Sequence, residues 1–472
     1  MAFYKELLTL CTFEENEIAD QKQRIERAFE ILGLGREDME RTEARIKKYY
    51  AIELLGVRKA IGLWLRELFD LVLAKEEGKN VIYFGYPPPI SIGYIIKHAT
   101  KPGNDYYIGC PEALLCQVLG QFFDKLTPVL ERGESQGFPP GHAMCGLLQV
   151  RSGALEMGII PVPDLAIGGS FYCDMGPKAD ELMHYRYGHH VEYLDSTMDS
   201  PWGSWPDYDP EKIKFLAAQI NKLFKTLKDK FGIEITDDIY EEGQVGLMQY
   251  FMAVYELNQH LLADPCPLSF ADAGLLLNLG GCNTGVSIEE GPEAVQILSK
   301  EVAKRVEEGY GVVPKGAPTV LTNIPSFADP AFNTLINEVG LAVPLTAFLL
   351  PPPETPPPPY PFTTLAEKLA ERFMYSGFFH SAYGAIKFFA GGLKSTEVDG
   401  VIFNYQLNCR PCVCRSKLCK EYIDNETELP MLLLEMDIYD DRNYSVSSVR
   451  TRLEAFAEML LAKKAEENNG II

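Results

Sequence analysis

The stretch DGVIFNYQLNCRPCVCRSKLCKEYIDNETELPMLLLE, residues 399–435, decides how the chain is interpreted. Its first apolar run, 401–405, has the composition of a buried strand, and a second run, 431–434, follows a segment with helical composition. Four thiols, Cys409, Cys412, Cys414 and Cys419, lie within eleven residues just past the first run. The stretch predicts two neighbouring strands with a dense group of thiols between them.

Similar short apolar runs occur elsewhere and alternate with helical patterns. This alternation predicts an α/β protein with parallel sheets that carry helices on both faces. The runs fall into two sets separated by a long helical block, residues 210–262. We expect strands at Val81–Gly85, Asp105–Gly109, Asp164–Gly169 and Val191–Leu194, and then at Thr319–Thr322, Leu341–Leu350, Val401–Tyr405 and Met431–Leu434.

The domain organisation follows from these two sets of strands. Residues 1–79 predict a helical N-terminal region, since apolar side chains recur at helical spacing and no strand pattern appears. Residues 80–310 predict a first α/β domain with a helical insert, and residues 311–472 a second α/β domain.

Charge and hydropathy exclude several functional classes. The 472-residue chain has a formal net charge of -22, so it lacks the basic surface that nucleic-acid binding requires. No apolar run approaches the ~20 residues of a membrane-spanning helix. The N-terminal segment lacks the features of a signal peptide, and we expect a cytoplasmic protein without nucleic-acid or membrane partners.

The eleven cysteines are the main chemical feature of the sequence. Clustered thiols in a cytoplasmic protein favour metal or redox chemistry over disulfides, and only Cys11 and Cys266 are interpreted as ordinary buried hydrophobes. Cys110, Cys173 and Cys409 each follow a predicted strand, where open α/β sheets bind ligands.

Two further thiols have distinctive local settings. Cys145 begins a predicted helix, whose dipole favours a thiolate, and Cys282 follows Gly280-Gly281, which predicts a turn. We therefore expect thiolates from distant segments to converge on an iron–sulfur cluster, with Cys409 among its ligands.

Spacing alone does not select the metal. The pattern Cys409-x2-Cys412-x-Cys414-x4-Cys419 matches neither the bacterial ferredoxin run nor a pair of zinc-binding C-x-x-C motifs, so a zinc site remains a lesser alternative. No G-x-x-x-x-G-K-[ST] motif occurs, which argues against an ATP-binding component. Glu435 and Asp437 end a predicted strand and are candidates either for acid–base chemistry or for capping a loop.

Three segments together resemble one protein family. They are PDLAIGGSFYCD at 163–174, DGVIFNYQLNCRP at 399–411 and PMLLLEMDIYDDRNYSVSSVRTRLEAF at 430–456. The last segment contains three elements of the family pattern in order. They are a P-x-L-x-x-E-x-D strand, the D-x-R element, represented by Asp441-Arg442, and a helix with Thr451-Arg452-Leu453-Glu454. The chain resembles the 2-hydroxyacyl-CoA dehydratase/benzoyl-CoA reductase family over roughly residues 80–462.

The resemblance implies two flavodoxin-like (Rossmann-like) domains with a [4Fe-4S] cluster between them. By position in the family pattern, Cys145, Cys173 and Cys409 are its ligands. It further implies an ATP-hydrolysing iron–sulfur activator, a homologous second subunit or a homodimer, and an acyl-CoA substrate. The implied enzyme acts by one-electron radical chemistry, either dehydrating a 2-hydroxyacyl-CoA or reducing an aromatic acyl-CoA.

The chain has more thiols than one such cluster needs. A family branch with a double-cubane [8Fe-9S] cluster reduces small molecules with electrons from an ATP-hydrolysing activator, and this branch is the main alternative. A non-enzymatic electron relay is the third. The candidate ligands of a second cluster are Cys110, Cys116, Cys282, Cys412, Cys414 and Cys419.

Overall fold

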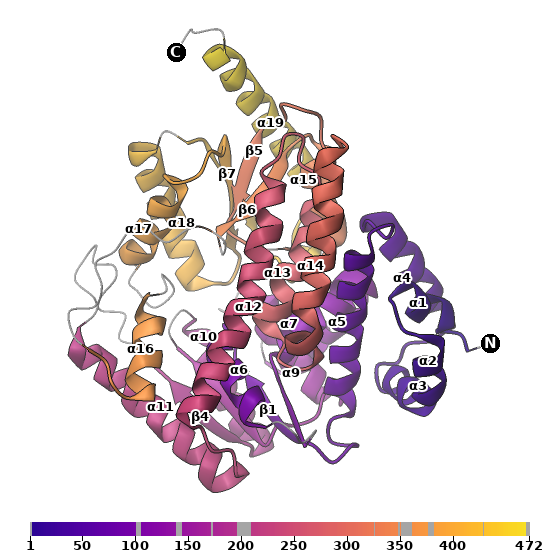
Figure 1. Cartoon of the computed structure of the whole chain (residues 1–472), viewed down its shortest axis with the longest axis vertical. Helices are drawn as coiled ribbons and strands as arrows, with labels where there is room; N and C mark the ends of the chain where they lie inside the picture. The colour runs from indigo at the N-terminus through magenta and orange to yellow at the C-terminus, as the bar shows by residue number, and fades with distance from the viewer. Residues whose placement is uncertain are drawn as a thin grey trace.

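Two four-stranded parallel sheets form the framework of the molecule, joined by long helices (Figure 1). The computed structural model describes residues 2–100, 105–137, 144–170, 173–195, 209–324, 326–347, 350, 361–375, 382–427 and 429–468. No helix in these ranges is both long and apolar enough to cross a bilayer.

The first sheet has the strand order β2-β1-β3-β4. Alternate residues of β1 point to opposite faces: Val81 and Tyr83 pack with one set of helices, and Ile82 and Phe84 with another. Both faces are therefore covered, as expected of a parallel sheet. Its elements are β1 Asn80–Phe84, α6 Ile90–Ala99, β2 Tyr106–Gly109, α7 Pro111–Leu115, the π-helix η1 Cys116–Phe122, α8 Thr127–Ser135, α9 Gly146–Glu156, β3 Leu165–Gly169, α10 Met175–Tyr187 and β4 His190–Leu194.

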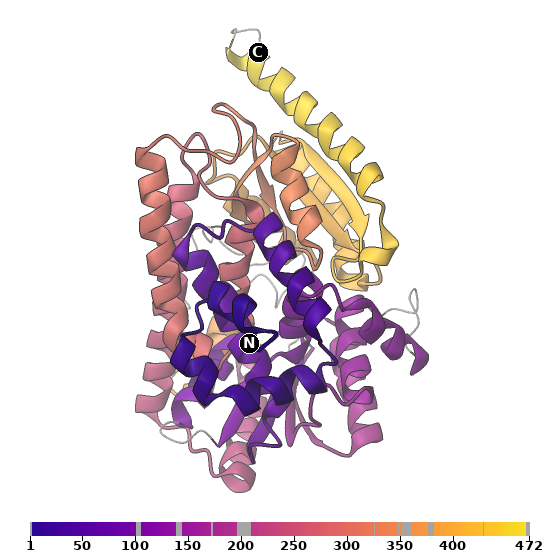
Figure 2. The same ribbon diagram turned by 90° about the vertical axis from the view of Figure 1, so that its right-hand side faces the viewer.

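The second sheet has the order β6-β5-β7-β8 and the same parallel pairing. Its two faces belong to separate apolar clusters, and Figure 2 shows α15 and α19 beside its strands. Its elements are β5 Thr319–Thr322, α15 Pro330–Glu338, β6 Ala342–Thr346, α16 Leu365–Tyr375, α17 Ala382–Leu393, β7 Gly400–Gln406, α18 Arg410–Glu426, β8 Met431–Met436, the 3-10 helix η4 Asp441–Asn443 and α19 Val446–Asn468.

Both sheets share one topology, with the second strand of each placed outside the first. This is the flavodoxin-like order, so the predicted fold class is confirmed. All eight predicted strands are present, although β6 is shorter than the predicted run 341–350. In such sheets the crevice that binds ligands lies where the chain leaves the first and third strands in opposite directions.

Four helices connect the two sheets: α11 Pro210–Phe231, α12 Asp237–Leu261, α13 Phe270–Cys282 and α14 Val286–Glu307. The predicted turn at Gly280-Gly281 is wrong, because these residues belong to α13. Gly280 is required by packing: a Cβ there would lie 2.4 Å from the ring of Tyr250 on α12. The glycine pair thus reflects close contact between two helices.

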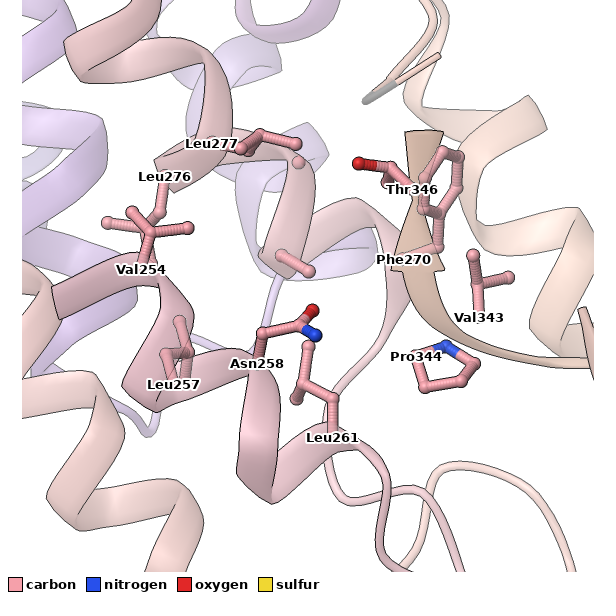
Figure 3. Close-up of a pocket in the computed structure, with 12 residues that line it drawn as sticks. Val254, Leu257, Asn258, Leu261, Phe270, Leu276, Leu277, Val343, Pro344 and Thr346 are labelled. Atoms are coloured by element: carbon pink, nitrogen blue, oxygen red, sulfur yellow. The ribbon is translucent and has the colours of Figure 1, made fainter. Parts of the chain in front are cut away.

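A small apolar cavity lies between α12, α13 and β6 (Figure 3). Its volume is about 20 Å³, enough for roughly one water molecule. Leu257, Leu261 and Phe270 line it, with Asn258 and Thr346 as polar exceptions. The cavity is therefore a packing defect between the two halves and is too small for an organic substrate.

The second half of the chain also contributes to the first sheet. Leu369 and Met374 of α16 belong to the same buried cluster as Ile82 and Ile167. This helix packs against α11, and Arg372 donates a hydrogen bond to Gln244 of α12. The first sheet therefore takes part of its cover from residues 365–375.

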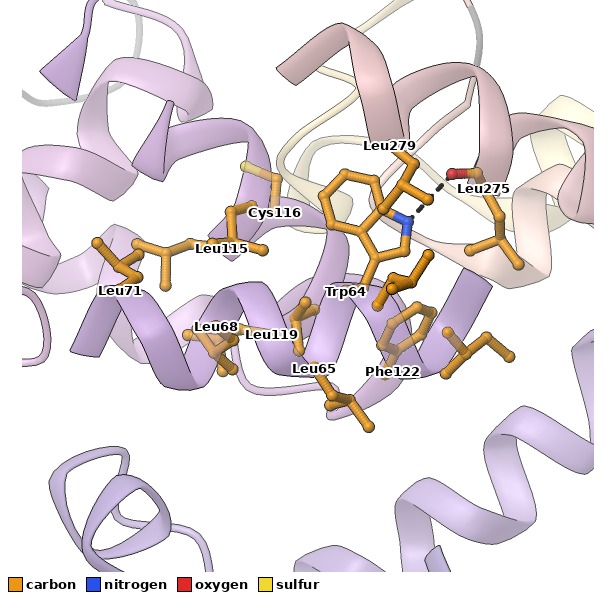
Figure 4. Close-up of a cluster of buried hydrophobic side chains, with 14 of the residues drawn as sticks. Trp64, Leu65, Leu68, Leu71, Leu115, Cys116, Leu119, Phe122, Leu275 and Leu279 are labelled. Atoms are coloured by element: carbon orange, nitrogen blue, oxygen red, sulfur yellow. Dashed lines mark hydrogen bonds between the residues drawn. The ribbon is translucent and has the colours of Figure 1, made fainter. Parts of the chain in front are cut away.

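The N-terminal region consists of α1 Lys5–Leu10, α2 Glu15–Asp20, α3 Lys22–Ile31, α4 Arg36–Tyr49 and α5 Leu55–Leu73. It is helical, as predicted, and α5 is buried on most sides. Trp64 of α5 lies beside Leu279 of α13, in one apolar cluster with Phe122, and donates its indole N–H to the Leu275 carbonyl at 3.0 Å (Figure 4). These contacts attach the helical region to the first sheet.

One carboxyl group on α5 is buried and forms no ion pair with any residue that the structure describes. Glu67 is fully buried and accepts a hydrogen bond from the Ser287 amide at 2.8 Å. Burial raises the pKa of Glu67 from 4.5 to about 7. Because the pKa of Glu67 is raised in the folded protein, the contribution of Glu67 to stability is complete below pH ~4.5 and is lost as pH rises through 7.

Glu67→Gln should remove this dependence, since a glutamine stays neutral and keeps the acceptor oxygen. Between pH 5 and pH 8 the variant should gain roughly 3 kcal/mol of stability relative to the wild type. Chemical denaturation at a series of pH values measures the difference. Glu290→Gln, at an exposed position on α14, is the matched control. If the free energy of unfolding changed with pH in the same way in the wild type and in Glu67→Gln, the raised pKa of Glu67 would be contradicted.

Candidate functional site

Three cysteines predicted as ligands lie at the starts of three helices. Cys145 is the N-cap of α9, Cys409 is the N-cap of α18, and Cys173 directly precedes Asp174, the N-cap of α10. Cys173 and Cys409 follow the third strand of the first and the second sheet respectively. Helix N-termini stabilise thiolates through unpaired amide N–H groups and the helix dipole.

The backbone around Cys145 is held by a carboxylate from the other sheet. The Gly146 amide donates to Asp437 Oδ2 at 2.7 Å, and the Tyr439 amide donates to Oδ1 at 3.0 Å. Burial raises the pKa of Asp437 to about 6. Asp437 therefore acts as a cap that joins β8 to α9, and a part for it in acid–base chemistry stays a prediction. Glu435 is exposed.

Cys173 is held by its own helix. The Gly176 amide donates to Cys173 Sγ at 3.2 Å. A Cβ at Gly176 would lie 2.8 Å from the Tyr86 carbonyl oxygen, so glycine is needed for this approach. Asp174 forms an ion pair with Arg410, the first residue of α18, which brings the starts of α10 and α18 together.

Cys409 follows a tight turn. Asn408 has φ 65°, in the left-handed region that asparagine tolerates, and the Cys409 amide donates to the Gln406 carbonyl at 3.0 Å. The pKa of Cys409 is raised by a hydrogen bond with Cys412, by burial, and by negative charge on Cys412 and Cys145. Cys409 and Cys412 therefore face the same space.

The three predicted ligands interact electrostatically. The pKa of Cys145 is raised by burial, then by Asp437, then by Cys173, and Cys145 in turn acts on Cys409. Cys145 thus connects the thiols of the two sheets. Within the described residues, no three His, Cys, Asp or Glu side chains are arranged around a single metal ion. In a cubane cluster each thiolate binds a different iron atom, so the ligands lie farther apart than the ligands of a single metal ion.

A second group of thiols lies on the first sheet beside Cys145. The Cys110 amide donates to the Cys282 carbonyl at 3.4 Å, and burial, Glu112 and Cys282 raise the pKa of Cys110. Negative charge on Asp437, Cys145, Glu112 and Cys282 adds to the effect of burial on the pKa of Cys116. Cys110, Cys116 and Cys282 therefore border the same region.

Charged side chains lie beneath this second group. Arg151 is buried between Glu112, at 3.0 Å, and Asp180, and the Cys110 thiol donates to Glu112 at 3.6 Å. A Cβ at Gly168 would lie 2.6 Å from Asp180, so the sheet needs glycine there. Sequence reasoning missed this network, because helical spacing gives no signal for contacts between separate helices.

The remaining thiols of the opening stretch lie along α18. Cys414 is exposed, whereas Cys419 is buried in an apolar cluster with Ile386 and Phe389. The segment of helical composition between the two strands is therefore a helix that begins at residue 410. Cys412 is placed beside Cys409, and the participation of Cys414 and Cys419 in a second cluster stays a prediction.

Two aromatic residues complete the site and were also missed. Tyr86 follows β1, Tyr439 follows β8, and their hydroxyl oxygens lie 3.4 Å apart. Both are partly buried against the core cluster that contains Cys145 and Cys173 at its margin. They are 353 residues apart in the sequence, which explains why no local pattern paired them.

Comparison with known proteins gives concordant matches. A family model described as 2-hydroxyglutaryl-CoA dehydratase, D-component, matches residues 127–460. The (R)-phenyllactyl-CoA dehydratase alpha subunit of Clostridium sporogenes is 22% identical over 356 residues, covering 71% of this chain and 81% of that protein. The (R)-2-hydroxyglutaryl-CoA dehydratase subunit alpha of Acidaminococcus fermentans is 20% identical over 313 residues, covering 64% and 61% respectively.

Asp437→Asn should destabilise the protein, because one side-chain atom changes from an acceptor to a donor that faces a backbone N–H. The expected loss is about 1–3 kcal/mol, the cost of leaving a buried polar group unpaired. Chemical denaturation measures it. Glu435→Gln, on the same strand but exposed, should change stability by less than roughly 0.5 kcal/mol. Equal effects of the two substitutions would refute the capping role.

Proposed function

Because the chain belongs to the 2-hydroxyglutaryl-CoA dehydratase D-component family, we propose that it is the iron–sulfur subunit of an ATP-dependent 2-hydroxyacyl-CoA dehydratase. Both curated relatives are subunits of dehydratases, which favours dehydration over reduction of an aromatic acyl-CoA. The observation that carries the proposal is that Cys145, Cys173 and Cys409, drawn from both sheets, lie at helix starts and are linked electrostatically through Cys145.

These residues fit a [4Fe-4S] cluster by the chemistry of their donors. Thiolates are the ordinary ligands of such clusters, and amide N–H groups near the sulfurs help to stabilise the negative charge. The Gly176 amide already donates to Cys173, and amides of Leu147 and Leu148 donate to Cys145. When bound, the cluster supplies single electrons of low potential.

The protein would fix the orientation of the ligands and limit access of water. Asp437 holds the start of α9, and the Arg410–Asp174 ion pair holds the starts of α18 and α10 together. The rings of Tyr86 and Tyr439 meet edge to face and join the loops that follow β1 and β8. Exclusion of water strengthens every electrostatic interaction within such a site.

The proposal includes further proteins. Both relatives are named alpha subunits, which supports a second, homologous subunit, and we extend this to an ATP-hydrolysing iron–sulfur activator that delivers the electrons. The sequence supports the separation of roles, since it has no G-x-x-x-x-G-K-[ST] motif. The acyl-CoA thioester is the proposed substrate.

One observation favours the second candidate, a double-cubane [8Fe-9S] reductase. Cys110, Cys116 and Cys282 adjoin Cys145, so a second set of thiols lies next to the first. The side-chain nitrogen of Asn283, beside Cys282, is buried and donates to no acceptor among the described residues. Such a donor is suited to a sulfide ion. Cys110 and Cys116 precede the segment that matches the family, whereas Cys282 lies within it.

Iron and sulfide content distinguishes the two candidates. Anaerobically purified protein should contain about four iron atoms per chain if one cluster is present and about eight if two are. The first result should be accompanied by loss of the 2-hydroxyl from a 2-hydroxyacyl-CoA when activator, ATP and reductant are supplied. About eight iron atoms without this turnover would replace the first candidate with the second.

Cys409→Ser should lose most of the bound iron and the associated visible absorption, since one ligand of the cluster is removed. The measurement is iron and sulfide per folded chain, with circular dichroism as a check on folding. Cys266→Ser is the matched control, because Cys266 is buried in a separate apolar cluster and donates to Leu268. Full iron content in Cys409→Ser protein would contradict the ligand assignment.

A further inference from the structure

The Tyr86–Tyr439 pair connects the two sheets at the level of the thiols. Tyr86 lies two residues beyond the end of β1, and Tyr439 lies three residues beyond the end of β8. The rings meet edge to face, with centroids 6.4 Å apart, and the hydroxyl oxygens are 3.4 Å apart. The pair is therefore a polar contact between loops that belong to different halves of the protein.

The hydrogen bond within the pair has a direction. Tyr439 donates its hydroxyl proton to the oxygen of Tyr86, so Tyr86 keeps a proton of its own to donate. No acceptor for that proton is present among the residues that the structure describes. A Cβ built at Gly176 would lie 2.8 Å from the Tyr86 carbonyl oxygen and 3.6 Å from Cys173 Sγ, and one built at Gly146, next to Cys145, would lie 3.2 Å from Tyr439 Cβ. The tyrosine pair therefore lies beside the proposed ligands Cys145 and Cys173.

Both phenols remain protonated in this setting. Burial is the largest cause of the raised pKa of Tyr86, and the nearby Cys282 contributes in the same direction. Burial also raises the pKa of Tyr439, with contributions from Tyr86, Cys116 and Cys145. Each hydroxyl is thus a neutral donor.

Among the residues that the structure describes, two arginines near the site are already paired. Arg151 is held between Glu112 and Asp180, and Arg410 is held by Asp174. Electrons added to a buried cluster therefore gain little from these two charges. Neutral hydrogen-bond donors can stabilise these electrons instead, and hydrogen bonds to sulfur are known to set the potentials of iron–sulfur clusters.

We propose that Tyr439 and Tyr86 form a two-step donor chain that ends on a sulfur of the bound cluster and raises its reduction potential. The inference rests on the proposed function, because it needs a cluster, but it holds for one cluster or two. Tyr86 is the direct donor. Tyr439 is a positioning residue, which orients the Tyr86 hydroxyl and strengthens its hydrogen bond by polarising it.

The test compares three anaerobically purified, cluster-loaded variants with the wild type in a potentiometric titration followed by electron paramagnetic resonance. Tyr86→Phe should lower the ratio of reduced to oxidised cluster at a fixed potential roughly tenfold, the effect of losing one hydrogen bond to a charged acceptor. Tyr439→Phe should lower it in the same direction by a smaller factor. Tyr106→Phe is the control, since its hydroxyl donates to Phe231 and Tyr106 lies at the opposite end of the first sheet.

A second readout separates tuning from a merely structural role. The wild-type signal should contain the coupling of an exchangeable proton that disappears in deuterated buffer and is absent in Tyr86→Phe. An unchanged potential in loaded Tyr86→Phe protein would overturn this inference alone. Loss of iron from Tyr86→Phe would also overturn it, by assigning the hydroxyl to cluster retention. A wild-type chain that takes up no iron would overturn the proposed function and this inference with it.

Discussion

The hydrogen bond from the Gly146 amide to Asp437 is the constraint on which the site depends. Asp437 comes from the end of the second sheet, whereas Gly146 begins a helix of the first, so this one contact fixes Cys145 relative to both sheets. The acceptor is buried and its second oxygen binds the Tyr439 amide. A buried carboxylate whose two oxygens both accept hydrogen bonds has little freedom to move. The loops that carry Cys145 and Tyr439 are therefore held in place by the same side chain.

The electrostatics of the site oppose the ionisation of its own residues. Burial raises the pKa of Cys110, Cys116 and Cys145, and the thiols raise the pKa values of one another. Amide groups at helix N-termini act in the other direction. A binding partner with positive iron atoms would reverse this balance, because coordination deprotonates thiols outright. The arrangement therefore keeps the thiols protonated on their own, and binding of such a partner would release their protons.

The sequence predicted the strands of both sheets but not the contacts between the two halves of the protein. Eight apolar runs predicted eight strands, because buried parallel strands need continuous apolar side chains. The positions of Cys173 and Cys409 after strands were visible for the same reason. In contrast, Gly280-Gly281 suggested a turn, since nothing local reveals the Tyr250 ring that packs against Gly280. The Tyr86–Tyr439 contact was equally hidden, because pairing over that distance depends on how the two sheets face each other.

The packing of α16 against α11 has a consequence for biosynthesis. Strands β1 to β4 are complete by residue 194, but the apolar cluster on one face of their sheet is completed by residues 365–375. A nascent chain that leaves the ribosome from its N-terminus thus exposes an unfinished apolar surface while the following 170 or so residues are translated. Chaperones that bind apolar segments would have their longest opportunity during this interval. The native order of assembly is then set by translation, with the first sheet sealed only after much of the second has emerged.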